Sequence, residues 1–295
     1  MNLRDMEYIV AIAERLNMAR AAGHCHVSAS TLSIQLRKLE DELGVKLFER
    51  NNKRIKITAV GELILESARA TLREAGRMQG IAREYQNPFS GEFHLGLFPT
   101  LAPYLLPVIT RKIQKAHPHL DLALIEEKSP GLIDKLLRGE MDAALLALPI
   151  HSPNLEYKLL FSDPFLLACH RMHPLGKRKR VDVTDLKDEE LLLLEDGHCF
   201  RDQALEVCHL AKARENRAFR GTSLETLRRM VSANLGVTLM PKIACLREAH
   251  LTYVPFVEKR TPFRQIAIVY RSTSTRRKVI ESLAALISRA HREEC

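Results

Sequence analysis

The sequence predicts two parts of different fold class: a small, mostly helical domain followed by a long helix, and then a larger α/β domain. Apolar residues recur at helical spacing over the first forty or so positions, and a long amphipathic stretch follows. After residue 90, short apolar runs alternate with helical patterns. A chain of 295 residues is also too long for one ordinary core. We therefore expect domains at residues 1–58 and 91–295, with a linker helix and hinge at 59–90.

The composition indicates a globular protein with a basic surface. Hydrophobic residues make up 46% and charged residues 27% of the chain. A formal net charge of +9 and a pI near 9.3 favour a polyanionic partner, although membrane lipids or an incidental excess would fit equally well. The N-terminus lacks an export signal and no apolar run approaches about eighteen residues, so we expect a cytoplasmic protein without a membrane partner. Its six cysteines should then be reduced thiols.

The first helices have the spacing of a helix-turn-helix. An amphipathic helix is predicted from about Arg4 to Leu16, and Asn17 can cap a short second helix that carries small alanines. Ser28 or Ser30 can cap a third helix, which Gly44 would end. Small alanines let the third helix cross the second closely, which is the packing that this motif needs.

The exposed face of the third helix carries side chains that can bond base edges and phosphates. They are Ser30, Thr31, Ser33, Gln35, Arg37 and Lys38. Residues 48–58 then alternate basic and apolar positions around a polar turn, as a two-stranded wing would, and Arg50 and Lys53 could follow the DNA backbone. A merely solvated helix face is the alternative. The predicted wing makes binding to double-stranded DNA the better interpretation.

These residues resemble the LysR-type family of bacterial transcriptional regulators. The resemblance rests on Ser28 to Ser33, Gln35 to Glu40, Leu43-Gly44, Leu47 to Arg50, Thr58 and Gly61. It implies a winged helix-turn-helix that binds promoter DNA, a homodimer or homotetramer, contact with RNA polymerase, and no enzymatic activity. The chain departs from the family at Ala29-Ser30, where members usually have Gln-Pro, so the bases that it reads cannot be transferred from relatives.

The linker is predicted to be one long helix. Thr58 can cap it, and an apolar stripe at alternating spacings of three and four runs to about Tyr85. The stripe consists of Leu65, Ala68, Leu72, Ala75, Gln79 and Ala82. The resemblance implies a dimerisation arm, whereas a helix folded onto its own domain is the alternative. Residues 87–91 should break the helix.

The larger part has the pattern of two α/β subdomains. Short apolar runs predict strands at residues 93–97, 122–125, 143–148, 165–169, 191–194, 237–240 and 266–270. Thr100 and Ser129 each lie where a strand turns into a helix, so they can serve as simple caps or face a ligand at the helix amides. The family resemblance implies crossing strands like those of a periplasmic binding protein, with a sensing site between the subdomains.

Two cysteines lie in one segment of this domain. Cys199 follows His198 and precedes Arg201, so positive neighbours and helix amides should lower its thiol pKa, and the thiolate is the form that peroxide oxidises. Asp202 can orient the segment or handle a proton if it faces the cleft. Cys208 would stand about 13 Å away in a continuous helix. A disulfide needs about 4.4 to 6.8 Å between α-carbons, so closing it must rearrange the segment. Two small buried residues are the alternative.

The segment 195–204, together with Cys208 and residues 222–228, resembles the hydrogen-peroxide-sensing members of the LysR-type family. The resemblance implies a reversible disulfide between Cys199 and Cys208 that regulates the oxidative-stress response. It also implies a peroxide pocket, for which Thr100, Ser129, His198 and Arg264 are the candidates. We add Asp202 as a further candidate because it lies in the same segment as Cys199. We expect no cofactor and no metal, because His117 and His119 lack a regular third ligand. Two alternatives remain: a metabolite sensor with incidental cysteines, and a thiol enzyme such as a peroxidase.

Overall fold

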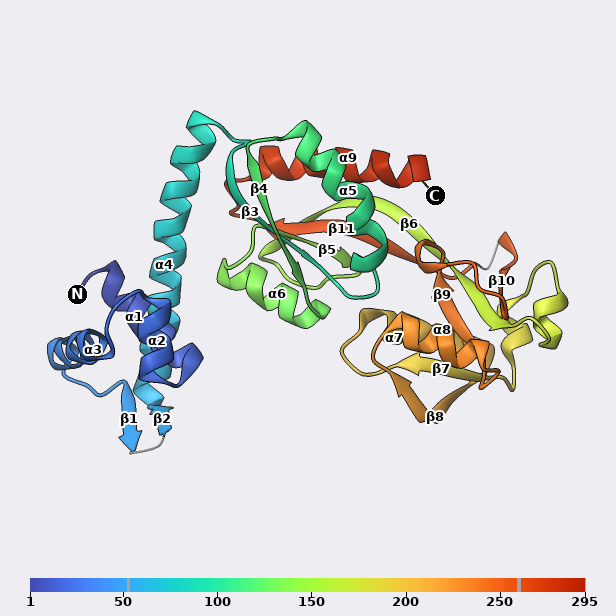
Figure 1. The fold of residues 1–295 in the computed structure, drawn as a ribbon, viewed down its shortest axis with the longest axis horizontal. Coiled ribbons are helices and arrows are strands. Elements are labelled where there is room, and N and C mark those ends of the chain that lie inside the picture. The colour runs from blue at the N-terminus through green and yellow to red at the C-terminus, as the bar shows by residue number, and fades with distance from the viewer. Residues whose placement is uncertain (52–53, 259–260, 295) are drawn as a thin grey trace. The chain divides into compact units, whose positions relative to one another are not determined.

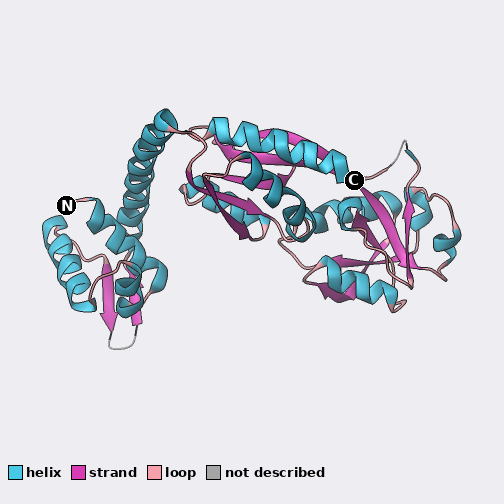
Figure 2. Ribbon diagram, turned by 45° about the horizontal axis from the view of Figure 1, so that its top comes forward, coloured by secondary structure: helices cyan, strands magenta, loops and turns pink. Residues whose placement is uncertain are grey.

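A computed structural model describes residues 1–51, 54–258 and 261–294, and Lys53 therefore lies outside the described residues. The chain forms two compact units, Met1–Gln86 and Asn87–Cys295. Figure 1 labels their helices and strands, and Figure 2 shows the mainly helical first unit and the mixed second unit.

The first unit is a three-helix core with a two-stranded wing and one long helix (Figure 1). Its elements are α1 (Leu3–Arg15), α2 (Met18–His24), α3 (Ala29–Leu43), β1 (Phe48–Asn51), β2 (Arg54–Ile57) and α4 (Ala59–Gln86). Asn17 caps α2 by accepting a hydrogen bond from the backbone N–H of Arg20. Ser28, rather than Ser30, caps α3. Gly44 ends α3 with a φ of 70°, in the left-handed region that favours glycine.

The long helix α4 belongs partly to the core of its own unit. Thr58 caps it, because its hydroxyl accepts the N–H of Gly61 at 2.9 Å. Leu65 and Ala68, the first residues of the predicted stripe, are buried in the core of the three helices. The later residues Leu72 and Ala75 are half-buried, while Gln79 and Ala82 are exposed. The first part of the stripe therefore packs within the unit, and the second part presents apolar and polar side chains to the solvent.

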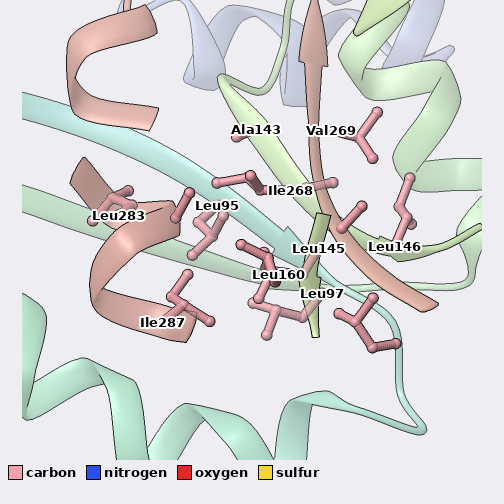
Figure 3. Close-up of a cluster of buried hydrophobic side chains, with 14 of the residues drawn as sticks. Leu95, Leu97, Ala143, Leu145, Leu146, Leu160, Ile268, Val269, Leu283 and Ile287 are labelled. Atoms are coloured by element: carbon pink, nitrogen blue, oxygen red, sulfur yellow. The ribbon is translucent and has the colours of Figure 1, made fainter. Parts of the chain in front are cut away.

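The first half of the second unit is an α/β layer around a parallel core. Strands β3 (Gly91–Leu97), β4 (Leu120–Glu126) and β5 (Ala143–Ala147) run parallel, and β11 (Phe263–Arg271) joins β5 in the antiparallel sense. Helices α5 (Ala102–Ala116) and α9 (Arg277–Glu294) pack together, and α6 (Ser129–Arg138) packs on β5. Figure 3 shows apolar side chains of β3, β5, β11 and α9 gathered in this core, for example Leu95, Leu145, Ile268 and Leu283.

The second half of the unit is built on one long strand. Strand β6 (Leu155–His170) pairs with β11 in its first half and with β9 (Thr238–Pro241) and β10 (Leu251–Pro255) in its second half (Figure 1). Helices α7 (Cys199–Ala211) and α8 (Leu224–Ser232) pack against β7 (Glu190–Leu194), which pairs with β8 (Arg214–Gly221). This half has its own apolar core. The predicted two subdomains joined by a crossing strand are thus confirmed.

The sequence reading missed three stretches of strand. Strands β8 and β10 and the first half of β6 were not predicted. Strand β8 consists of polar and charged residues over most of its length, and the first half of β6 carries Ser162-Asp163-Pro164, which resembles a break. Short 3-10 helices also occur in this unit, among them Pro174–Lys177, Val183–Leu186 and Lys242–Ala244. No helix within the described ranges is long and apolar enough to cross a membrane.

Candidate functional site

Cys199 lies where the two subdomains of the second unit meet. It is the first residue of α7, and its half-buried side chain packs against the core of the first subdomain, although α7 belongs to the second. Ser129, the first residue of α6, faces the Cys199 thiol across this junction. Thr100 precedes α5, so Thr100 and Ser129 both follow the carboxyl ends of parallel strands, where α/β sheets commonly bind ligands. The sequence placed these two residues correctly at strand-to-helix turns, but the alternative that they are simple caps is wrong, because the cap residues are Leu101 and Lys128.

A fully buried arginine, Arg264, acts on the Cys199 thiol. Arg264 on β11 is paired in register with Asp163 on β6, and its Nε donates to that carboxylate at 2.9 Å. Its other nitrogens donate to the hydroxyl of Thr100 at 2.9 Å and to the Thr100 carbonyl at 3.1 Å. Arg264 is only 1% exposed, and its positive charge lowers the pKa of the Cys199 thiol. The predicted arginine therefore acts electrostatically on the cysteine, but its partner Asp163 was missed.

The pKa of Cys199 is raised from its ordinary value, contrary to the sequence expectation. Burial is the largest cause, and it outweighs the lowering effects of Ser129, Arg264 and the Phe200 backbone N–H. The Ser129 hydroxyl faces the thiol and lowers its pKa. The two groups are not aligned well enough to form a full hydrogen bond, and Ser129 Oγ has no other partner in the described part of the chain. The helix amide contributes as predicted. Sequence reasoning failed because it could not see how little water reaches the thiol.

Arg201 was expected to stand near the thiol, and this is wrong. Its guanidinium is 5% exposed and forms ion pairs with Asp196 at 2.8 Å and Glu215 at 2.9 Å. It also donates to the carbonyl of Leu194 at 3.0 Å. Arg201 therefore fixes the loop before α7 to the second subdomain, and Arg264 supplies the positive charge beside Cys199.

His198 is a buried, neutral neighbour of the thiol. It precedes α7 as its N-terminal cap residue and is 4% exposed. Burial is the main cause that lowers its pKa, and the nearby Lys128 ammonium adds to the effect. His198 therefore cannot act as the positive neighbour that the sequence suggested, although its ring remains able to accept or donate a hydrogen bond.

Three polar atoms near Cys199 are buried without a hydrogen-bond partner among the described residues. They are Ser129 Oγ, His198 Nε2 and Gln203 Oε1. His198 adjoins Cys199, and Gln203 follows it by one helical turn on the same side of α7. Buried polar groups are normally bonded, so this cluster suits a small polar ligand. Asp202 differs from them because its side chain is exposed, and its negative charge raises the thiol pKa.

Cys208 has quite different surroundings. It is 4% exposed within the core of the second subdomain, and burial raises its pKa to about 11. Both cysteines are free and lie on the single continuous helix α7. Nine residues at the helical rise separate their α-carbons by about 13 Å. The continuous helix that this separation assumes is present, and a bond between the two requires α7 to rearrange.

The candidate DNA-reading face lies on α3. Ser30, Thr31, Arg37 and Lys38 are exposed, while Ser33 and Gln35 are half-buried. The hydroxyls of Ser30 and Thr31 each lie 2.8 Å from that of Ser28. The predicted wing is confirmed as β1 and β2, which pair Phe48 with Ile57. Arg50 is placed in β1 by its backbone, but its side chain lies outside the described part of the structure.

A buried carboxylate fixes the start of the wing. Glu40 on α3 is 5% exposed and accepts the backbone N–H groups of Leu47 and Phe48 at 2.9 and 3.3 Å. Thr58 donates its hydroxyl to the Lys46 carbonyl at 2.7 Å, which ties the other end of the wing to the same turn. Glu40, Leu47, Phe48 and Thr58, which are among the residues that carry the family resemblance, thus form one connected set of contacts.

No group of three or more potential metal-ligating side chains occurs in the part of the chain that the structure describes.

Comparisons with known proteins agree with these features. Residues 3–62 match the family described as bacterial regulatory helix-turn-helix protein, lysR family, and residues 86–292 match the LysR substrate binding domain. The chain therefore belongs to the LysR family of bacterial regulators, whose helix-turn-helix binds DNA.

Among its relatives is the hydrogen peroxide-inducible genes activator of Dickeya chrysanthemi, which is 46% identical over 96% of this chain and 94% of the relative. A solved full-length OxyR of Pseudomonas aeruginosa with a cysteine-to-aspartate substitution shares 36% identity and a TM-score of 0.79, covering 97% of this chain and 94% of that one. An H2O2-bound cysteine-to-serine mutant of Corynebacterium glutamicum OxyR shares 32% identity and a TM-score of 0.68, covering 99% and 93%.

Proposed function

We propose that this chain is a transcriptional regulator of the oxidative-stress response that senses hydrogen peroxide through a reversible Cys199–Cys208 disulfide. The observation that carries the proposal is the surroundings of Cys199: a thiol at the subdomain junction, beside a buried arginine and three buried polar atoms without partners. The names of the relatives support the same signal.

The first chemical step takes place in the pocket around Cys199. Its thiolate attacks one peroxide oxygen, the O–O bond breaks, and the departing hydroxide takes up a proton to give water and a sulfenic acid on Cys199. Arg264 favours the thiolate and the negative charge that develops on the departing oxygen, because it is held in place by Asp163 and Thr100. Ser129 and His198 supply buried hydrogen-bonding atoms near the sulfur.

The second step joins the two cysteines. The Cys208 thiolate attacks the sulfenic sulfur, the S–O bond breaks, and a second water leaves as the disulfide forms. Overall, one peroxide and two thiols give one disulfide and two waters. The α-carbons must approach from about 13 Å to about 6 Å, so part of α7 unwinds or moves. A local oxidation thereby becomes a structural change in the second subdomain.

The output of this change is altered contact with promoter DNA. We infer a homodimer through the exposed later part of α4, which carries Gln79 and Ala82, and assembly to a tetramer through the second units. Oxidation would then change the spacing of the DNA contacts and the recruitment of RNA polymerase. The protein would act in the cytoplasm, where its DNA lies, and consume peroxide only once per reduction, as a regulator rather than an enzyme.

A second candidate function is a metabolite sensor, and one observation favours it. A pocket of about 480 Å³ lies beside α5 and α8, lined in part by Tyr104, Ser223 and Arg228. Its size is suitable for a small organic molecule. This pocket does not involve Cys199, so the two candidates predict different behaviour when the thiol is removed.

The test compares the wild type with Cys199→Ser and Cys208→Ser. DNase footprints and transcription from a bound promoter are measured before and after peroxide treatment. We expect the wild type to change its footprint, Cys199→Ser not to respond, and Cys208→Ser to stop at a sulfenic acid that dimedone traps. An undiminished response in Cys199→Ser would refute the proposal and favour the metabolite sensor. Sustained peroxide consumption with added reductant would instead indicate an enzyme.

A further inference from the structure

The loop that leads into Cys199 is tied to the opposite subdomain by one lysine. Lys128 precedes α6 in the first subdomain, and its ammonium lies 2.5 Å from the Glu195 carboxylate in the loop before α7. The same ammonium donates to the carbonyl of Asp196 at 3.1 Å. The lysine ammonium therefore contacts the loop at both the Glu195 side chain and the Asp196 backbone.

The loop backbone leaves room for this contact. Gly197 adopts a φ of 88°, and a Cβ added there would lie 3.2 Å from the Lys128 side chain. The aliphatic part of the lysine thus passes closely over the glycine before its ammonium reaches Glu195. Lys128 also adjoins Ser129, which faces the Cys199 thiol. The Lys128–Glu195 contact and the pocket around Cys199 therefore both involve the turn that begins α6.

The other side of this loop is tied to the second subdomain. Asp196 pairs with Arg201 at 2.8 Å and with Arg220 at 3.3 Å. The contacts of Arg201 stay within the second subdomain, whereas the Lys128 contact joins this loop to the first. Movement of the loop away from the junction must therefore break the Lys128 contact.

Disulfide formation requires such a movement. Cys208 is buried in an apolar core near the end of α7, whereas Cys199 is half-buried at the first residue of the helix, next to the loop. We take the Cys199 end as the one that moves, because Cys208 is 4% exposed inside the apolar core whereas Cys199 lies at the edge of that subdomain. When Cys199 moves toward Cys208, residues 195–198 move with it.

We propose that Lys128 is a positioning residue that holds Cys199 in the peroxide pocket and opposes closure of the Cys199–Cys208 disulfide. This inference rests on the proposed function. The pair is 40% exposed on each side, so its contribution is that of a partly solvated ion pair with one added carbonyl bond. Loss of Lys128 should favour the disulfide about two- to tenfold, which lowers the reduction potential by about 9 to 30 mV.

The test measures the fraction of oxidised protein in a series of dithiothreitol buffers, using the full-length chain. Lys128→Gln and Glu195→Gln should each lower the potential, and the double variant should lower it no further than Lys128→Gln alone, because that substitution already removes both contacts. Lys128→Arg should restore the wild-type value. Lys135→Gln is the matched control, because Lys135 forms an equally short 2.5 Å pair with Glu127 at similar exposure but does not reach the loop.

A merely structural role would lower the thermal stability without moving the potential. The inference is overturned if the wild type forms the disulfide but Lys128→Gln and Glu195→Gln have the wild-type potential. It is also overturned if the effects of the two single variants add fully in the double variant, since they would then act separately. If the wild type forms no Cys199–Cys208 disulfide, the proposed function itself fails and this inference falls with it.

Discussion

Removing one partner of the buried Arg264–Asp163 pair should strongly destabilise the second unit. Substitution of Asp163 by alanine leaves the Arg264 guanidinium buried, with only the hydroxyl and carbonyl of Thr100 as acceptors. Breaking a buried ion pair in this way costs about 3 to 5 kcal/mol. In a unit of about 200 residues, each kcal/mol lowers the Tm by about 2 to 4 °C, so a loss of about 6 to 20 °C is expected.

The assay is thermal unfolding of the reduced protein, followed by circular dichroism, with Glu156→Ala as the control. Glu156 also lies on β6 and pairs with Arg277 at 2.7 Å, but both side chains are more than 40% exposed. Such a pair contributes at most about 1 kcal/mol. If Asp163→Ala unfolds within about 2 °C of Glu156→Ala, the pair does not carry the stability that its burial implies, and the reasoning is refuted.

Three further predictions concern titration and the wing. Because burial raises the pKa of the Cys199 thiol, its alkylation rate should rise about tenfold per pH unit between about pH 7 and 8.5, and a plateau below about pH 8 would contradict this. The pKa of His198 is lowered by burial, so below about pH 6.5 the unfolded chain binds a proton that the folded chain does not. Stability should therefore fall on acidification by up to about 1.4 kcal/mol per pH unit more than in His198→Asn, and parallel urea-unfolding curves for the two proteins would exclude the effect. Glu40→Ala removes the acceptor of two wing N–H groups and should destabilise the first unit by about 1 to 3 kcal/mol in urea unfolding, whereas unchanged stability would show that these groups find other partners.

The DNA-reading unit could be predicted from the sequence because its determinants are local. Helix caps such as Asn17 and Ser28, the stop at Gly44, and the alternating wing all act within a few residues. The sequence left Ser28 and Ser30 open as caps of α3, and the structure shows that Ser28 is the cap. The two α/β subdomains were also predictable, since buried strands appear as short apolar runs.

The electrostatics of the thiol site could not be predicted, because they depend on residues far apart in the chain. Arg264 meets Asp163 across 101 positions, and Asp163 is an isolated acidic residue in an otherwise apolar stretch. That isolation was the one available indication, since a buried carboxylate needs a partner. Lys128 meets Glu195 across 67 positions and had no local indication at all. Arg201 was misassigned because sequence proximity to Cys199 does not show which way its side chain points.

The most direct test of the redox switch is mass mapping of the reduced full-length protein after one equivalent of hydrogen peroxide. The reaction is quenched in acid, the remaining thiols are alkylated in denaturant at neutral pH, the chain is digested without reduction, and the peptides are compared with those of untreated protein. The account predicts a peptide pair joined through Cys199 and Cys208, with Cys25, Cys169, Cys245 and Cys295 alkylated. Oxidised Cys199 accompanied by free, alkylated Cys208 in a protein whose DNA footprint has changed would contradict it.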